Sequence, residues 1–84
     1  MKSTRQEVYK VIDAERDYQD SLSSDRTDGR DHHSGDFIVM MNYYINKLNE
    51  AWTINAGDTE ALKVMRKIAG IAVHCMEKHG AINR

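Results

Sequence analysis

The last third of the chain carries an uninterrupted helical repeat of apolar residues. Between Asp58 and Gly80 they recur every three or four positions, the period of an α-helix with one buried side. Asp58 or Thr59 is predicted to cap the start of this helix, and Gly80 to end it in the left-handed conformation. The repeat comprises Ala61, Met65, Ile68, Ala72 and Met76, with Leu62, Ala69 and Cys75 beside them. The chain must therefore adopt a fold that buries one side of a long helix.

The rest of the 84 residues contains no proline and no strand-like alternation, so the sequence predicts an all-α fold of three helices. The first covers residues 5–22 and begins with the capping box Thr4-Arg-Gln-Glu7. The second covers residues 35–54, with Ser34 as its cap, and is apolar on most sides of its first half. A short turn before the third helix, at 58–79, predicts a long antiparallel helical hairpin. We expect a single all-α domain over residues 1–84, with a polar loop at 23–34.

The small size of the chain predicts self-association. A domain of this length buries too little surface to be more than marginally stable. A disulfide within the chain is excluded because Cys75 is its only cysteine. We expect a homo-oligomer, a dimer or higher, built as a helical bundle that shares the second helix. A lone cysteine, no leader and no long apolar run predict a cytoplasmic protein without membrane contact, and no cofactor is expected.

The charge is divided unevenly along the chain. Residues 1–36 carry six basic and nine acidic side chains, net −3, and residues 37–84 carry six basic and four acidic ones, net +2. A protein that binds duplex nucleic acid is normally far more basic, so this partner is disfavoured. A small anion bound by a local basic surface is compatible with the balance.

Candidate anion-binding residues share the basic side of the third helix. Arg66 suits bidentate recognition of phosphate, although such strips are often merely solvated. An interior helical glycine costs about 1 kcal/mol relative to alanine, so Gly70 predicts that a ligand or a neighbouring helix comes close there, with the helix favoured. The strip consists of Lys63, Arg66, Lys67, His74 and Lys78.

Further candidates lie outside the third helix. Tyr9 or Tyr43 is predicted to stack on a base, the alternative being packing in the core. Arg26 and Arg30, in the polar loop, are predicted either to clamp an anion or to remain solvated.

Two constellations have structural as well as functional interpretations. Glu15 falls on the apolar side of the first helix, where it either pairs with a cation such as Arg66 or reaches water at the edge. Cys75 and His79 have the spacing of two metal ligands on one helix, but packing is the favoured role. We predict no catalytic residue and no metal site.

Three segments carry a resemblance to a known family. These are Val-Ile-Asp-Ala-Glu-Arg-Asp-Tyr-Gln-Asp-Ser-Leu at 11–22, Ser-Gly-Asp-Phe at 34–37 and the ending from Ala61 to Gly80. Together they resemble small phage-encoded MazG-like proteins. The resemblance implies an all-α nucleoside triphosphate pyrophosphohydrolase that uses magnesium and assembles into dimers or tetramers of helical bundles. It also implies a location in the cytoplasm of the host cell.

The chain departs from this family where the family holds metal. MazG-like enzymes carry Glu-Glu-x-x-Glu on the second helix and Glu-x-x-Asp on the third. Here these helices read Asn42-Tyr-Tyr-Ile-Asn46 and Lys63-Val-Met-Arg66, so no metal ligand is carried over. We therefore expect a non-catalytic nucleotide-binding protein that sequesters a nucleotide signal of host immunity, such as a cyclic nucleotide. The alternatives are a helical protein that inhibits a host protein and a divergent pyrophosphohydrolase.

Overall fold

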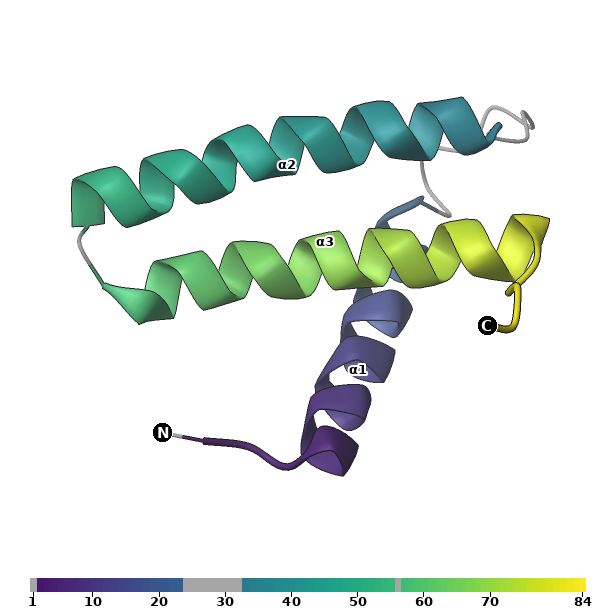
Figure 1. Cartoon of the computed structure of the whole chain (residues 1–84), viewed down its shortest axis with the longest axis horizontal. Coiled ribbons are helices and arrows are strands. Elements are labelled where there is room, and N and C mark those ends of the chain that lie inside the picture. Colours follow the sequence, from purple (N-terminus) through teal and green to yellow (C-terminus); the bar gives the residue numbers. More distant parts are fainter. Residues whose placement is uncertain (1, 24–32, 56) are drawn as a thin grey trace.

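The computed structural model describes residues 2–23, 33–55 and 57–84, and this part of the chain forms three α-helices without a strand (Figure 1). The helices are α1 at Arg5–Ser23, α2 at Ser34–Asn55 and α3 at Asp58–His79. The predicted all-α fold is confirmed, and each predicted helix boundary is within one residue of the observed one. Most of the predicted polar loop, with Arg26 and Arg30, lies outside the described residues.

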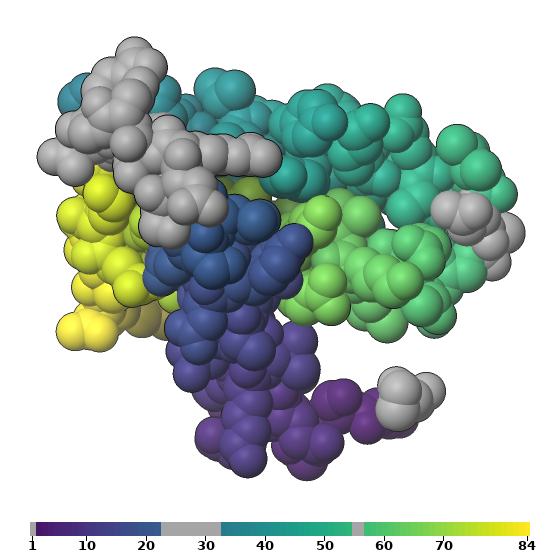
Figure 2. All heavy atoms as spheres, turned by 180° about the vertical axis from the view of Figure 1, so that it is seen from behind, coloured from purple at the N-terminus to yellow at the C-terminus, as the bar shows by residue number. Residues whose placement is uncertain are grey.

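The helices α2 and α3 form the predicted antiparallel hairpin, and α1 crosses α3 on one side of it. Figure 1 shows the hairpin with α1 behind α3, and Figure 2, from the opposite side, shows α1 in front. The whole chain extends over 39 × 28 × 28 Å. Because α1 covers only part of one side, the hairpin keeps a second side that α1 does not reach.

The helix ends confirm some predicted caps and correct others. Thr4 N–H donates to Glu7 Oε1 at 2.9 Å and Glu7 N–H donates to Thr4 Oγ1 at 3.1 Å, so the capping box at the start of α1 is confirmed. The α2 helix begins at Ser34 itself, and the preceding His33 N–H donates to Asp36 Oδ2 at 2.8 Å. Asp36 therefore stabilises the helix start that Ser34 was predicted to cap.

The predicted cap of α3 is wrong. The helix already includes Asp58, so the cap position falls to Gly57. No side-chain hydrogen bond caps the helix there. Gly80 ends α3 as predicted in that its φ is positive, at 111°, but its ψ of 143° lies outside the left-handed helical region. Its N–H donates to the Met76 carbonyl at 2.8 Å.

The apolar core of the described chain is small. Its buried apolar side chains are Phe37, Ala61 and Ile71. The Phe37 ring is fully buried on α2 and meets two imidazoles of α3 edge to face, with centroids 5.0 Å from His74 and 6.1 Å from His79. These contacts hold the start of α2 against the end of α3.

The apolar stripe of α1, formed by Val8, Val11, Ile12, Tyr18 and Leu22 at helical spacing, does not form core. Only Ile12 of the stripe is half-buried. The side of α1 that lies on α3 instead carries polar residues, among them Glu15 and Arg16, both almost fully buried. The other members of the stripe are 42% to 55% exposed: Val8, Val11, Tyr18 and Leu22.

None of the helices in the described part of the chain is long and apolar enough to span a membrane.

Candidate functional site

The contact between α1 and α3 is built around a buried carboxylate. The Glu15 side chain is 5% exposed, and its Oε1 accepts a hydrogen bond from Arg66 Nε at 2.9 Å. Its Oε2 accepts a second bond from Gln19 Nε2 at 3.0 Å, which also donates to the Lys67 carbonyl at 3.2 Å. The predicted pairing of Glu15 with Arg66 is confirmed, and both carboxylate oxygens are satisfied.

Gly70 is the point of closest approach between these helices. A Cβ atom at this position would lie 2.8 Å from Gln19 Nε2 and 2.9 Å from Glu15 Cγ. Only a residue without a side chain allows α1 to come this near. Of the two predicted neighbours of Gly70, the structure therefore shows the helix.

Arg16 is the second buried charge at this contact. Its Nε donates to Glu77 Oε1 at 2.8 Å and its Nη2 donates to Asp20 Oδ1 at 2.7 Å, with a longer bond of 3.4 Å from Nη1 to Gln19 Oε1. Burial disfavours the charged guanidinium, but these carboxylate partners outweigh it and raise the pKa of Arg16 above its ordinary value. Arg16 is therefore committed to holding α1 on α3.

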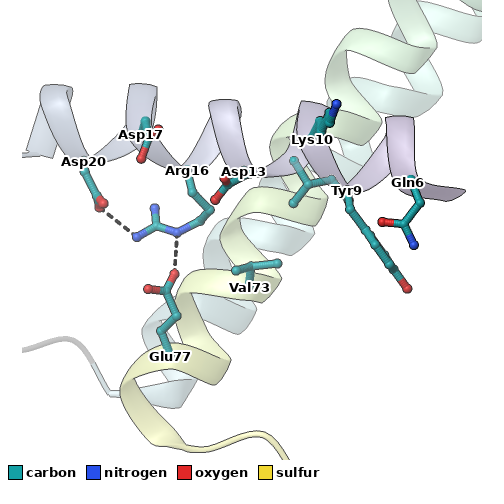
Figure 3. Close-up of a pocket in the computed structure, with 10 residues that line it drawn as sticks. Gln6, Tyr9, Lys10, Asp13, Arg16, Asp17, Asp20, Val73 and Glu77 are labelled. Carbon is teal, nitrogen blue, oxygen red and sulfur yellow. Dashed lines mark hydrogen bonds and ion pairs between the residues drawn. The ribbon is translucent and has the colours of Figure 1, made fainter.

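An open cavity of about 540 Å³ lies beside Arg16, between α1 and α3 (Figure 3). Four carboxylates and two basic groups line it, giving a net charge of −2. Such a charge repels phosphate, so the cavity is a poor nucleotide site despite the presence of Tyr9. Its lining residues are Gln6, Tyr9, Lys10, Ile12, Asp13, Arg16, Asp17 and Asp20 on α1, with Val73 and Glu77 on α3.

A different cluster of lysines and tyrosines lies where α2 meets α3. The Lys67 Nζ of α3 lies 5.5 Å from the Tyr44 ring centroid, and the Lys47 Nζ lies 5.5 Å from that of Tyr43. The two tyrosine rings pack edge to face, with centroids 5.1 Å apart. We call Tyr43, Tyr44, Lys47 and Lys67 the lysine–tyrosine cluster. It combines aromatic faces with two cations, the chemistry that binds a base and a phosphate.

The predicted basic strip of α3 does not form one continuous surface. Lys67 and His74 contact rings of α2, whereas Arg66 bonds Glu15 of α1. Lys63 lies one turn before Lys67, on the surface, where its Nζ bonds Glu60 Oε1 at 3.0 Å. Neighbouring positions on a helix point about 100° apart, so two flanking helices divide the strip between them.

The environment of His74 also differs from that of a solvated ligand residue. Burial lowers the pKa of His74 below its ordinary value of 6.5, as do the positive charges of Arg16 and Lys78. The carboxylates of Asp20 and Glu77 act in the opposite direction without cancelling this effect. His74 is thus favoured as a neutral ring against Phe37.

The structure brings together only part of the predicted site. Tyr43 and Lys67 belong to one cluster, linked through Tyr44, while Tyr9 lies in the acidic cavity. The sequence also offered Tyr44 as an aromatic that could stack on a base, but Lys47 was not among the predicted contacts. The spacing of Tyr43 and Lys47, four residues apart on one helix face, was the available signal.

The predicted pair of Cys75 and His79 forms no recognisable metal site. Cys75 is a free, half-buried thiol, and the His79 ring packs on Phe37. Across the described ranges, no three His, Cys, Asp or Glu side chains gather as metal ligands do.

No known family model, curated protein or solved structure matches this chain.

Proposed function

We propose that this protein binds a nucleotide-sized anion without transforming it, and that the lysine–tyrosine cluster contacts the ligand. The observation that carries the proposal is the pairing of two ammonium groups with two adjoining tyrosine rings, at 5.5 Å each. A tyrosine ring stacks on any nucleobase, and a lysine ammonium binds phosphate oxygens. On binding, the base takes the place of an ammonium over a ring, and that ammonium turns to the phosphate.

Neighbouring charges support an anionic ligand. Lys63 adds a third ammonium one turn from Lys67, and the Arg66 side chain, 41% exposed, remains within reach of solvent while its Nε bonds Glu15. Glu50 and Glu60 hold Lys47 and Lys63 only through exposed ion pairs, at 3.5 and 3.0 Å. Such pairs contribute about 0–1 kcal/mol and exchange readily for a phosphate.

The biological part of the proposal rests on the resemblance to phage-encoded MazG-like proteins. A phage protein that binds a nucleotide without turnover would lower the free concentration of a host immune signal, such as a cyclic dinucleotide. It would do so in the host cytoplasm, as a homo-oligomer, since the core of one chain is small.

Isothermal titration of the purified protein with ATP, ADP-ribose and a cyclic dinucleotide tests this function. We expect binding of at least one of them, weakened roughly five- to 150-fold in Lys67→Ala and in Tyr43→Ala, as expected for loss of a phosphate contact or a stacked base. Lys10→Ala is the matched control, because Lys10 is a helical lysine that lines the acidic cavity instead. Absence of binding to all three ligands, or a loss confined to Lys10→Ala, contradicts the proposal.

A second candidate function is favoured by the exposed apolar side chains of α2. Ile38, Val39 and Trp52 are all largely exposed, as they would be on a helix that docks on another protein. This candidate is a helical interaction protein that inhibits a host protein. Light scattering separates the two functions, because an inhibitor that docks through these side chains must keep them free and remain monomeric, whereas we expect an oligomer.

A further inference from the structure

One side of the α2–α3 hairpin is apolar and largely exposed. Its residues recur at alternating steps of three and four along both helices, the heptad spacing of helices that pack side by side. We call this surface the open face. It comprises Ile38, Met41, Ile45, Leu48 and Trp52 on α2, and Leu62, Met65, Ala69, Ala72 and Met76 on α3.

The described part of the chain does not fill the open face. Its six exposed large side chains keep 43% to 58% of their surface accessible, and its other four residues are half-buried. The centre of the α3 part carries Ala69 and Ala72, which allow another backbone to come close, while larger residues lie toward both ends. This arrangement is that of half an interior rather than of a solvated surface.

Helix geometry places both parts of the open face on the same side of the hairpin. Ile38 directly follows Phe37, which faces α3. Ile71 is buried and lies one turn after Lys67, so it is on the side of α3 that contacts α2. Ala72 is the residue that directly follows Ile71. Each step turns about 100° clockwise when viewed from the N-terminal end of its own helix. Because α2 and α3 are antiparallel, the clockwise turn from Phe37 to Ile38 and the clockwise turn from Ile71 to Ala72 lead to the same side of the hairpin.

The α1 helix lies on the other side. Gly70 marks its contact on α3, about 120° from the centre of the open face at 100° per residue. The figures agree, since α1 lies behind the hairpin in Figure 1 and in front of it in Figure 2. The open face is therefore the side of the hairpin toward the viewer in Figure 1.

We propose that a second copy of this chain covers the open face, so that two hairpins form a four-helix bundle with α1 on the outside. The chain exposes 7002 Å², whereas a compact protein of its mass exposes about 5,100 Å². The excess is larger than the roughly 800 Å² that each partner buries in a stable complex. The radius of gyration of 13.9 Å likewise exceeds the value of about 12 Å for a compact chain of this length.

The chemistry of the open face favours a copy of itself over a different partner. None of its ten residues carries a charge, so two identical faces meet without like-charge repulsion. A partner selected by electrostatics would require complementary charges that this surface does not provide. The heptad steps on two antiparallel helices match the packing of four-helix bundles.

This inference rests on the self-association included in the proposed function, but not on ligand binding. Lys67 points roughly opposite to Ala69 on α3, so the lysine–tyrosine cluster and the open face are separate surfaces. Loss of ligand binding at the cluster should therefore leave self-association intact, and loss of self-association should leave the cluster intact.

Sedimentation equilibrium of the full chain tests the interface. We expect the wild type to sediment with at least twice the chain mass of 9.7 kDa. Ile45→Lys, on the open face of α2, should weaken association at least about tenfold, because a bundle interior does not accommodate an unpaired ammonium. The matched control is Val39→Lys, which places the same group on an exposed position of α2 outside the open face and should leave the mass unchanged.

A second variant guards against simple unfolding. Met65→Lys makes the corresponding change on α3 and should dissociate the protein while circular dichroism still reports helix. Lys67→Ala should keep the wild-type mass even where it removes ligand binding. A wild type that sediments as a single chain at every concentration overturns the inference. So does equal dissociation by Ile45→Lys and Val39→Lys.

Discussion

At the scale of single residues, Gly70 and Glu15 determine how α1 meets α3. The glycine removes the side chain that would otherwise hold the helices apart, and the carboxylate takes two hydrogen bonds in the space gained. The sequence indicated both features separately: a glycine inside a helix and a carboxylate on an apolar stripe. It left open whether they meet, because only the crossing of two helices brings two positions so far apart in the sequence into contact.

Replacing Gly70 by alanine should destabilise the protein by roughly 1 kcal/mol. The new methyl group would overlap Gln19 and Glu15, which costs about 1–3 kcal/mol, and the better helix propensity of alanine returns about 1 kcal/mol. Urea unfolding measures the difference. Gly35→Ala is the matched control, because a Cβ there meets nothing within 4 Å and should be neutral or stabilising. Unchanged stability of Gly70→Ala would show that α1 is not held this closely.

Removing Arg66 should destabilise the protein by about 1–3 kcal/mol, since it leaves the buried Glu15 carboxylate with one fewer partner. Lys63→Ala, the control on the same helix, removes an exposed ion pair with Glu60 and should cost less than about 0.5 kcal/mol. The free energy of unfolding from urea titrations distinguishes them. Equal effects would contradict the structural role of Arg66. A loss of nucleotide binding without a loss of stability would make Arg66 a ligand contact only.

At the scale of elements, α3 is the helix on which the other two lie. One flank contacts α2 through apolar and aromatic groups, and another contacts α1 through a polar network. The helices and the hairpin were predictable because periodicity, capping residues and a short turn are local signals. The orientation of α1 was not, because its apolar stripe suggested burial while its polar side makes the contact. The division of the basic strip between α1 and α2 was not predictable either, because a helical wheel does not show where neighbouring helices lie.

The contact between α2 and α3 should weaken as pH falls. The pKa of His74 is lowered in the folded protein, mainly by burial, so the unfolded chain takes up its proton first. The contribution of His74 to the free energy of unfolding is complete above its pKa in the unfolded chain, 6.5. It is lost as pH falls below 6.5 toward the lower pKa of His74 in the folded protein. The groups that act on its charge are Arg16 and Asp20 of α1 with Glu77 and Lys78 of α3, and Phe37 of α2 packs on its ring.

Urea unfolding of the wild type and His74→Gln at several values between about pH 7.5 and pH 5 measures this dependence. The free energy of unfolding of the wild type should fall more steeply toward low pH than that of the variant. Parallel pH profiles would show that His74 does not contribute.

At the scale of the whole molecule, the chain combines a small apolar core with a large uncovered apolar surface. Its described part buries three apolar side chains, yet leaves two and a half heptads of apolar residues exposed or half-buried on each helix of the hairpin. The small size of the chain already predicted an oligomer. The structure was needed to locate the surface that we propose for self-association. Only in the folded hairpin can the apolar positions of α2 and α3 be assigned either to the contact between these helices or to the open face.

Native mass spectrometry of the protein purified from cells tests the central claim most directly, because one spectrum reports both the number of chains and any bound small molecule. The proposed self-associating nucleotide-binding protein predicts an even number of 9.7 kDa chains with the added mass of a nucleotide, which Lys67→Ala loses while the number of chains stays the same. A single chain without added mass, which also stays free of ligand when nucleotides are supplied, would contradict it.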